Sequence, residues 1–211
     1  MKNYILFDND GVLVETEMWY YRASAEVLYE MGIAMDEASY KEIMINGLSS
    51  FVLAERAGFD AVSVEKARHR RNELYRHYLQ HEDITINGVN EVLHALSRRF
   101  RMGIVTTSRR VDFELIHRNR GIVDMMEFVL CVEDYARSKP HPDPYLKGLE
   151  CFHATAHEAI VVEDSERGLR AAVAANIETV IVKNDFTAAH DFSQATHRIE
   201  TLEELESLLA L

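Results

Sequence analysis

Two aspartates separated by a single residue follow the first apolar run of the chain. Asp8 and Asp10 come directly after residues 4–7, and Gly11 follows them. Successive residues of an extended strand point to opposite sides, so the two carboxylates can converge only if the chain bends after Asp8. Gly11 permits such a bend because it tolerates backbone angles that are closed to other residues. Two carboxylates held so close repel each other, which calls for a cation or a shared proton.

Four further polar residues come just after later apolar runs or in the loops beyond them, namely Thr106, Lys139, Glu163 and Asp164. A set of this kind suits phosphoryl transfer. Asp8 is a nucleophile that can form an acyl-phosphate. Asp10 can give a proton to the leaving oxygen and later take one from water. The Thr106 hydroxyl, the Thr107 backbone N–H and the Lys139 ammonium can hold phosphoryl oxygens.

Three of these carboxylates also predict a metal site. Asp8, Glu163 and Asp164 supply the hard oxygen ligands that Mg²⁺ prefers, and the ion would offset the repulsion between carboxylates and phosphate. Taken singly, the pieces have simpler explanations, such as a surface lysine, a helix cap or a satisfied hydroxyl at a strand end. Their joint occurrence next to predicted strands favours one site.

Apolar runs predict the elements that must position these side chains. Strands are expected at 4–7, 102–105, 128–131, 159–162 and 179–182, with helices between them and a last helix at the C-terminus. One of these helices is expected to begin at a Ser108 cap and to end near Gly121. Short strands alternating with helices predict an α/β fold, a parallel sheet with helices on both faces. In such sheets ligands bind beyond the carboxyl ends of the strands, where these polar residues would lie.

Composition limits the class of protein and of partner. The 211 residues are 47% hydrophobic, enough for one sizeable core and a smaller module. The net charge of −12 disfavours nucleic acid and anionic membrane as main partners. Cys131 and Cys151 form no closely spaced metal motif, and we expect no signal peptide before the first strand pattern. We therefore expect a cytoplasmic protein. We also expect a monomer whose partner is a small phosphorylated metabolite.

The motifs together resemble those of a known family. They are Phe7-Asp8-Asn9-Asp10-Gly11-Val12-Leu13, Val105-Thr106-Thr107-Ser108, Ser138-Lys139-Pro140-His141-Pro142-Asp143, and Val162-Glu163-Asp164-Ser165 with Gly168 and Ala171-Ala172. The chain is similar over nearly its whole length to haloacid dehalogenase-like hydrolases of the beta-phosphoglucomutase and phosphoglycolate phosphatase branch. This resemblance implies a Rossmann-like core, 1–15 plus 84–211, with an inserted α-helical cap domain at 16–83. It also implies Mg²⁺ as the cofactor, with the main-chain carbonyl of Asp10 as a further ligand.

Within that family, the resemblance favours a phosphatase that acts on a small phosphomonoester, such as a sugar phosphate. Asp10, Glu163 and Asp164 argue against dehalogenase relatives, and Asp10 argues against phosphonatase relatives. A sugar phosphomutase of the beta-phosphoglucomutase type is the alternative, although Tyr20 and Ser50 stand where such mutases carry a histidine and an arginine. A non-catalytic phosphate-binding module is a further alternative.

The cap of the family selects the substrate, so cap residues are candidates for substrate contact. They are Glu15 in the linker, Tyr20 in the first cap helix, and Asn46, Gly47 and Ser50 in a cap loop. Trp19, Tyr20 and Tyr21 are also candidates for packing. The basic run 66–77 is expected to form the solvated face of a helix, with a local positive field that steers an anion toward the site as the alternative. Asn176 stands where the family commonly has glycine, and asparagine also tolerates a left-handed turn.

Overall fold

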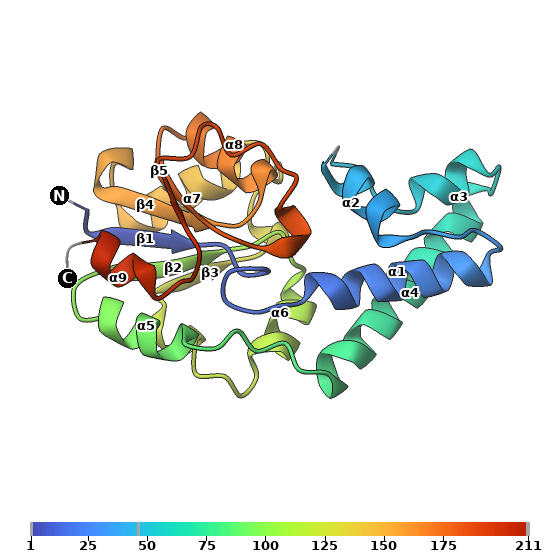
Figure 1. The fold of residues 1–211 in the computed structure, drawn as a ribbon, viewed down its shortest axis with the longest axis horizontal. Coiled ribbons are helices and arrows are strands. Elements are labelled where there is room, and N and C mark those ends of the chain that lie inside the picture. The colour runs from blue at the N-terminus through green and yellow to red at the C-terminus, as the bar shows by residue number, and fades with distance from the viewer. Residues whose placement is uncertain (1, 46, 210–211) are drawn as a thin grey trace. The chain divides into compact units, whose positions relative to one another are not determined.

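The computed structural model describes residues 2–45 and 47–209, and these divide into two compact units. The larger unit comprises Met1–Glu15 and Thr85–Leu211, and the smaller comprises Thr16–Ile84. Figure 1 traces the chain, which leaves the larger unit after its first strand and returns to it later. Among the described residues, no helix combines the length and the apolar composition that a bilayer crossing needs.

The larger unit is built on a parallel sheet of six described strands. They are β1 (Tyr4–Phe7), β2 (Arg101–Val105), β3 (Phe128–Leu130), β4 (Ala159–Glu163), β5 (Glu178–Val182) and β6 (His197–Ile199). The strand order is β3-β2-β1-β4-β5-β6, and every neighbouring pair is parallel. The expected α/β class is confirmed. β6 is absent from the strands that the sequence predicts. Only one of its residues, Ile199, is buried, so the strand forms no apolar run.

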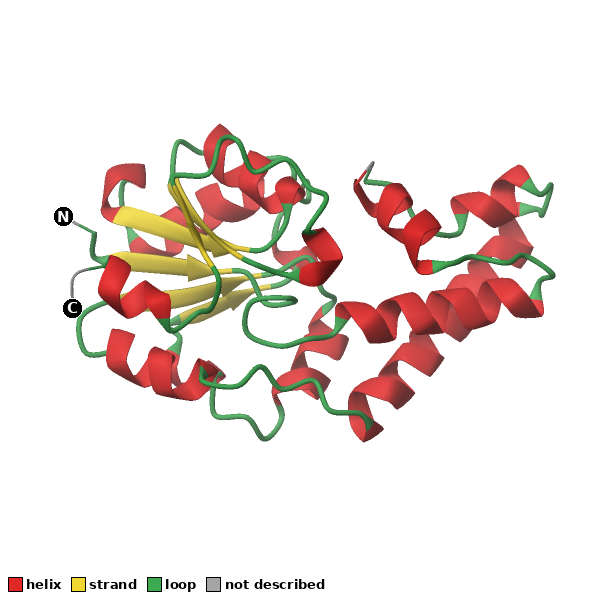
Figure 2. Ribbon diagram, viewed as in Figure 1, coloured by secondary structure: helices red, strands yellow, loops and turns green. Residues whose placement is uncertain are grey.

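Helices cover both faces of this sheet (Figure 2). They are α5 (Val89–Leu96), α6 (Arg110–His117), α7 (Asp143–Phe152), α8 (Glu166–Ala174) and α9 (Glu204–Leu208). Alternation along β1 divides the core. Ile5 and Phe7 pack in one apolar cluster with residues of α5, α6 and α9, whereas Leu6 packs in a second cluster with residues of α7 and α8. Burial on both faces explains why the central strands read as continuous apolar runs.

Register places the predicted site residues at one edge. Phe7 pairs with Ile104 of β2 and with Val162 of β4, so the carboxyl ends of the three strands are adjacent. Asp8 follows β1, Thr106 follows β2, and Glu163 ends β4. Parallel pairing in this register brings residues about 100 and 155 positions apart to the same rim of the sheet.

The smaller unit is helical. It contains α1 (Glu17–Glu30), α2 (Glu37–Ile45), α3 (Val52–Arg56) and α4 (Ala61–His81). α1 packs along α4 (Figure 1). The ring centroids of Trp19 and Tyr78 are 5.5 Å apart, and those of Tyr21 and Tyr40 are 5.2 Å apart. Aromatic packing therefore accounts for much of the aromatic run at the start of α1.

Candidate active site

The loop after β1 bends as the sequence predicts. Gly11 adopts a φ of 81°, in the left-handed region that favours glycine. A side chain at Gly11 would also overlap the carboxylate of Asp164, so glycine is needed for close approach as well as for conformation. Asp8 is held to the next strand by its backbone N–H, which donates to the carbonyl of Val162 at 2.9 Å. The bend thus places Asp8 against the end of β4.

Lys139 connects the first motif with the last. Its Nζ donates to Oδ1 of Asp8 at 2.7 Å, to Oε1 of Glu163 at 2.7 Å and to the carbonyl of Val105 at 2.9 Å. The Lys139 side chain is only 2% exposed, and that of Glu163 is fully buried. Burial alone would lower the pKa of Lys139, but the charges of Asp8 and Glu163 raise it above its usual value. Lys139 is therefore a fixed cation at the end of three strands.

Burial shapes the titration of the two carboxylates bonded to Lys139. Desolvation and the negative charge of Glu163 raise the pKa of Asp8 to about 7, although Lys139 opposes the shift. Burial would also raise the pKa of Glu163, but Lys139 and the hydrogen bonds from Tyr145 and the Ser165 backbone lower it below its usual value. Lys139 and the hydrogen bonds to Glu163 thus favour the charged form of Glu163, whereas burial beside Glu163 favours the protonated form of Asp8.

Five hydrogen bonds hold the Glu163 carboxylate. Its Oε1 accepts from Lys139 and from the Tyr145 hydroxyl at 2.7 Å. Its Oε2 accepts from the backbone N–H groups of Asp164 and Ser165 at 3.1 and 3.2 Å, and from the Ser165 hydroxyl at 3.0 Å. Tyr145 is an apolar position of α7 in the sequence pattern, so only the spatial arrangement shows its contact with Glu163. Ser165 also accepts from the backbone N–H of Gly168, which makes it the cap of α8.

Because Gly168 has no side chain, it leaves space for the carboxylate of Glu163, and an alanine at this position would occupy that space. A Cβ at this position would overlap the Glu163 carboxylate. We expect Gly168→Ala to push Glu163 off Lys139 and lower kcat at least about tenfold, since a small misplacement at a catalytic site is costly. Steady-state kinetics and a thermal melt would check this. Arg170→Ala, an exposed change on the same helix, is the control; unchanged kcat in Gly168→Ala would contradict the packing argument.

Three buried carboxylates lie close enough to share a cation. One oxygen from each of Asp8, Glu163 and Asp164 lies within 4.8 Å of the others. With the single ammonium of Lys139, these groups leave a net negative site when all are ionised. Buried carboxylate oxygens gathered in this way fit a hard divalent ion. The donor set is therefore suited to the metal that the sequence predicts.

Asp10 lies in the hydroxyl-rich part of the same rim. Its Oδ2 accepts from the Thr106 hydroxyl at 3.2 Å and from the Ser108 hydroxyl at 2.7 Å. The carbonyl of Thr106 accepts from the Tyr135 hydroxyl at 2.7 Å. Thr107 is the next residue of the loop after β2 and is half-buried. The prediction that Ser108 caps the following helix is wrong, because Arg109 is the N-terminal neighbour of α6 and the Ser108 side chain faces Asp10 instead.

A buried polar pair lies behind the aspartate loop and was not anticipated from the sequence. Oδ1 of Asn9, the residue between the two aspartates, lies 2.7 Å from Nε2 of His117 on α6. The His117 ring packs on Phe113, with centroids 4.4 Å apart. Burial lowers the pKa of His117 to about 4, so the imidazole is neutral at physiological pH. His117 thus supports the loop from within the core.

The candidate cap residues are distributed over both units. Glu15 is half-buried at the end of the first segment of the larger unit. Tyr20 packs edge-on against Tyr75, with ring centroids 5.1 Å apart. Gly47 is exposed with a φ of 67°, and the buried hydroxyl of Ser50 has no hydrogen-bond partner among the described residues. Asn46 lies outside the described residues.

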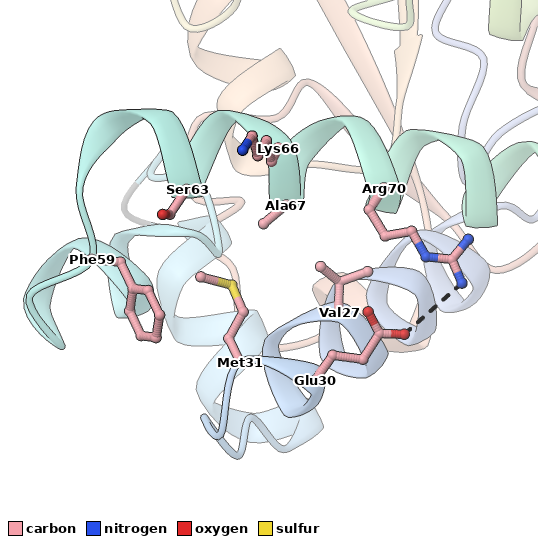
Figure 3. Close-up of a pocket in the computed structure, with 8 residues that line it drawn as sticks. All are labelled: Val27, Glu30, Met31, Phe59, Ser63, Lys66, Ala67 and Arg70. Atoms are coloured by element: carbon pink, nitrogen blue, oxygen red, sulfur yellow. Dashed lines mark ion pairs between the residues drawn. The ribbon is translucent and has the colours of Figure 1, made fainter.

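The basic run of α4 is only partly solvated. Arg71 is buried, with its guanidinium 4.2 Å from the ring centroid of Tyr20 and 5.5 Å from that of Phe51. Its neighbour Arg70 lies at an open pocket of about 410 Å³ in the smaller unit and pairs with Glu30 at 3.9 Å (Figure 3). None of the predicted site residues lines this pocket. The prediction of a solvated face is therefore wrong at Arg71, which points into the helical unit.

Comparison with known proteins finds relatives that match most of this chain. A family model described as haloacid dehalogenase-like hydrolase matches residues 5–182. "Phosphorylated carbohydrates phosphatase" of Thermotoga maritima is 29% identical over 182 residues, covering 83% of this chain and 82% of that protein. "Protein SUPPRESSOR OF QUENCHING 1, chloroplastic" of Arabidopsis thaliana is 26% identical over 194 residues, covering 88% of this chain but only 18% of that longer protein.

A solved structure shows the same fold. CbbY from Rhodobacter sphaeroides, crystallised in complex with phosphate, superposes with a TM-score of 0.84 at 23% identity. The match covers 97% of this chain and 96% of that one. The match therefore includes residues of both units of the chain.

Proposed function

Because the chain belongs to the haloacid dehalogenase-like hydrolase family, we propose that it is a magnesium-dependent phosphatase of small phosphomonoesters. The family membership expected from the motifs is confirmed by the match over 5–182. One observation carries the proposal: Lys139 holds Asp8 at 2.7 Å beside the carboxylates of Glu163 and Asp164. A nucleophile, a fixed cation and oxygen ligands for a metal are the parts that phosphoryl transfer needs.

In the proposed reaction, Asp8 attacks the phosphorus in line and forms an aspartyl-phosphate. Lys139, the Thr106 hydroxyl and the Thr107 backbone N–H stabilise the charge on the equatorial oxygens. Asp10 protonates the leaving oxygen, then takes a proton from the water that attacks the aspartyl-phosphate. The second step restores the carboxylate of Asp8 and releases inorganic phosphate.

The carboxylates of Asp8, Glu163 and Asp164 and the main-chain carbonyl of Asp10 would hold the magnesium ion. When bound, Mg²⁺ neutralises charge that builds up between the carboxylates and the phosphoryl group. Asp8 would then serve both as nucleophile and as ligand. The fit rests on the close approach of the three carboxylates and on their burial.

A sugar phosphate or a similar metabolite is the proposed substrate class. The support is the name of the Thermotoga maritima relative, a phosphatase of phosphorylated carbohydrates. The helical unit 16–84 would act as the cap, with Glu15, Tyr20, Gly47 and Ser50 as contacts and Asn46 as a further candidate. Because Tyr20 and Ser50 replace the histidine and arginine of the mutase pattern, we propose hydrolysis rather than isomerisation.

A panel of phosphate esters tests the proposal. Purified protein should release phosphate from p-nitrophenyl phosphate and from some sugar phosphates with Mg²⁺. Activity should vanish in excess EDTA and return when Mg²⁺ is restored. Free phosphate, not an isomerised sugar phosphate, should be the product. Turnover that resists EDTA, or a panel in which no ester is hydrolysed, would overturn the proposal.

Metal binding and protonation should compete at Asp8, whose pKa is raised to about 7. Without metal, the folded protein keeps this proton up to about pH 7, whereas the unfolded chain loses it above about pH 4. Asp8 therefore contributes stability at low pH that is lost as the pH rises from about 4 through about 7. Bound Mg²⁺ needs the ionised carboxylate. We expect the rise in melting temperature on adding Mg²⁺ to be small at pH 5 and larger at pH 8.

The comparison at each pH is made with and without Mg²⁺, so that other titrating groups cancel. His117, with its pKa lowered to about 4, is one such group and destabilises the fold as the pH falls below about 6.5. Asp8→Asn, which cannot titrate, should flatten the pH dependence of the Mg²⁺ effect. An equal Mg²⁺ shift at pH 5 and pH 8 in the unchanged protein would contradict the competition.

A further inference from the structure

Two hydroxyls donate to the same oxygen of Asp10. The Ser108 hydroxyl lies 2.7 Å and the Thr106 hydroxyl 3.2 Å from Oδ2. The backbone N–H of Ser108 in turn donates to the Thr106 hydroxyl oxygen at 3.0 Å. The three residues thus form a closed ring of hydrogen bonds in the loops after β1 and β2. The short distance makes Ser108 the stronger of the two donors to Asp10.

The two hydroxyls differ in what they can do once an ester is bound. A hydroxyl has one proton to donate. In the proposed reaction the Thr106 hydroxyl donates its hydrogen bond to a phosphoryl oxygen, and it then no longer donates to Asp10. Ser108 keeps its hydrogen bond to Oδ2 of Asp10. A carboxyl group rotates easily about its terminal torsion, so losing this short hydrogen bond would loosen the orientation of Oδ2.

We propose that Ser108 is a positioning residue for proton transfer by Asp10, an inference that rests on the proposed function. Ser108 fixes Oδ2 as the accepting oxygen, and the transferable proton is carried on Oδ1. As the Asp8 oxygen bonds to phosphorus and the ester P–O bond breaks, that proton passes from Oδ1 to the leaving oxygen. In the second step the attacking water gives a proton back to Oδ1, its oxygen bonds to phosphorus, and the bond from phosphorus to Asp8 breaks.

The test compares two esters of similar shape whose leaving groups differ. Benzyl phosphate leaves as an alkoxide and needs a proton, whereas p-nitrophenyl phosphate leaves as a stable phenolate and does not. The ratio of kcat to KM reports the steps up to the loss of the leaving group, so it isolates the acid role of Asp10. We expect Ser108→Ala to lower kcat/KM for benzyl phosphate about tenfold or more, as befits impaired general acid catalysis. For p-nitrophenyl phosphate the change should stay within about twofold.

Conservative and remote variants complete the design. Ser108→Thr keeps the hydroxyl and should restore most of the kcat/KM for benzyl phosphate. Ser97→Ala removes an exposed hydroxyl that donates to the carbonyl of His94, and it should change neither ester. Melting temperatures of all variants establish that they are folded. A folded Ser108→Thr variant keeps the comparison decisive if Ser108→Ala does not fold, since a loss selective for benzyl phosphate in Ser108→Thr would contradict the role of the hydroxyl.

Each outcome decides one of the two claims. An equal fall for both esters in Ser108→Ala, or no change for either, would overturn the positioning role while leaving the proposed phosphatase intact. Failure of the unchanged protein to hydrolyse either ester with Mg²⁺ would instead contradict the proposed phosphatase function. A fall confined to benzyl phosphate, with rescue by Ser108→Thr, would establish the role of Ser108.

Discussion

Asp8→Asn is expected to lower kcat at least about 10⁴-fold, a loss typical of removing the nucleophile of a covalent mechanism. An amide cannot form the acyl-phosphate, although it has nearly the same size and can still accept from Lys139. The folded protein should tolerate the change, because the carboxylate it replaces is buried and repelled by Glu163. Activity and stability should therefore separate: steady-state kinetics would show the loss, and a thermal melt would show a retained fold.

A control substitution tests whether replacing any aspartate by asparagine lowers kcat or stability. Asp124→Asn changes an exposed aspartate of the larger unit and should leave both kcat and melting temperature unchanged. If Asp8→Asn kept kcat within about tenfold of the unchanged protein, another group would be the nucleophile. The roles assigned to Lys139 and Asp10 would then need to be rebuilt around that group.

Lys139→Met is expected to damage both activity and stability. Methionine fills a similar volume but leaves Asp8 and Glu163 without the ammonium that joins them at 2.7 Å each. Breaking a buried ion pair by removing one partner costs about 3 to 5 kcal/mol. We expect a loss of this size in the free energy of unfolding, measured by urea denaturation of the metal-free protein. We expect kcat to fall at least about 10³-fold, because a charge that stabilises the transition state is gone.

A double variant separates the effect of losing Lys139 on stability from its effect on activity. In Lys139→Met with Glu163→Gln, the buried negative charge is removed together with the ammonium, so part of the lost stability should return. Activity should stay low, because the cation next to the phosphoryl group is still absent. A Lys139→Met protein that kept the full free energy of unfolding would contradict the network around Glu163. Recovery of kcat in the double variant would contradict the role of Lys139 in the reaction.

The sequence predicts the positions of these groups because the ends of the central strands can be recognised in it. The central strands are buried on both faces, so they appear as short apolar runs, and each ends where a polar motif begins. Parallel pairing then forces Asp8, Thr106 and Glu163 to one rim without further information. The bend after Asp8 can also be predicted from the local sequence. Gly11 has a φ of 81°, which glycine adopts readily.

The contacts that hold the groups in place are not readable from one sequence. Tyr145 looks like a core residue of a helix, and only the fold shows that its hydroxyl reaches Glu163. Ser108 looks like a helix cap, but its hydroxyl bonds to Asp10 across 98 residues of chain. Asn9 and His117 are 108 residues apart and lack any periodic signal. The short edge strand β6 is mostly exposed and polar, so it gives no apolar run.

Trapping the phosphorylated residue tests the central claim most directly. Asp10→Asn should still pass the phosphoryl group from p-nitrophenyl phosphate to Asp8 but should be slow to release it, because the base that activates water is missing. Reduction with borohydride converts an aspartyl-phosphate to homoserine, which peptide mass spectrometry locates. We predict conversion at Asp8, and none when Asp8→Asn is combined with Asp10→Asn. Phosphate release with a modification at any other residue, or with none, would contradict the account.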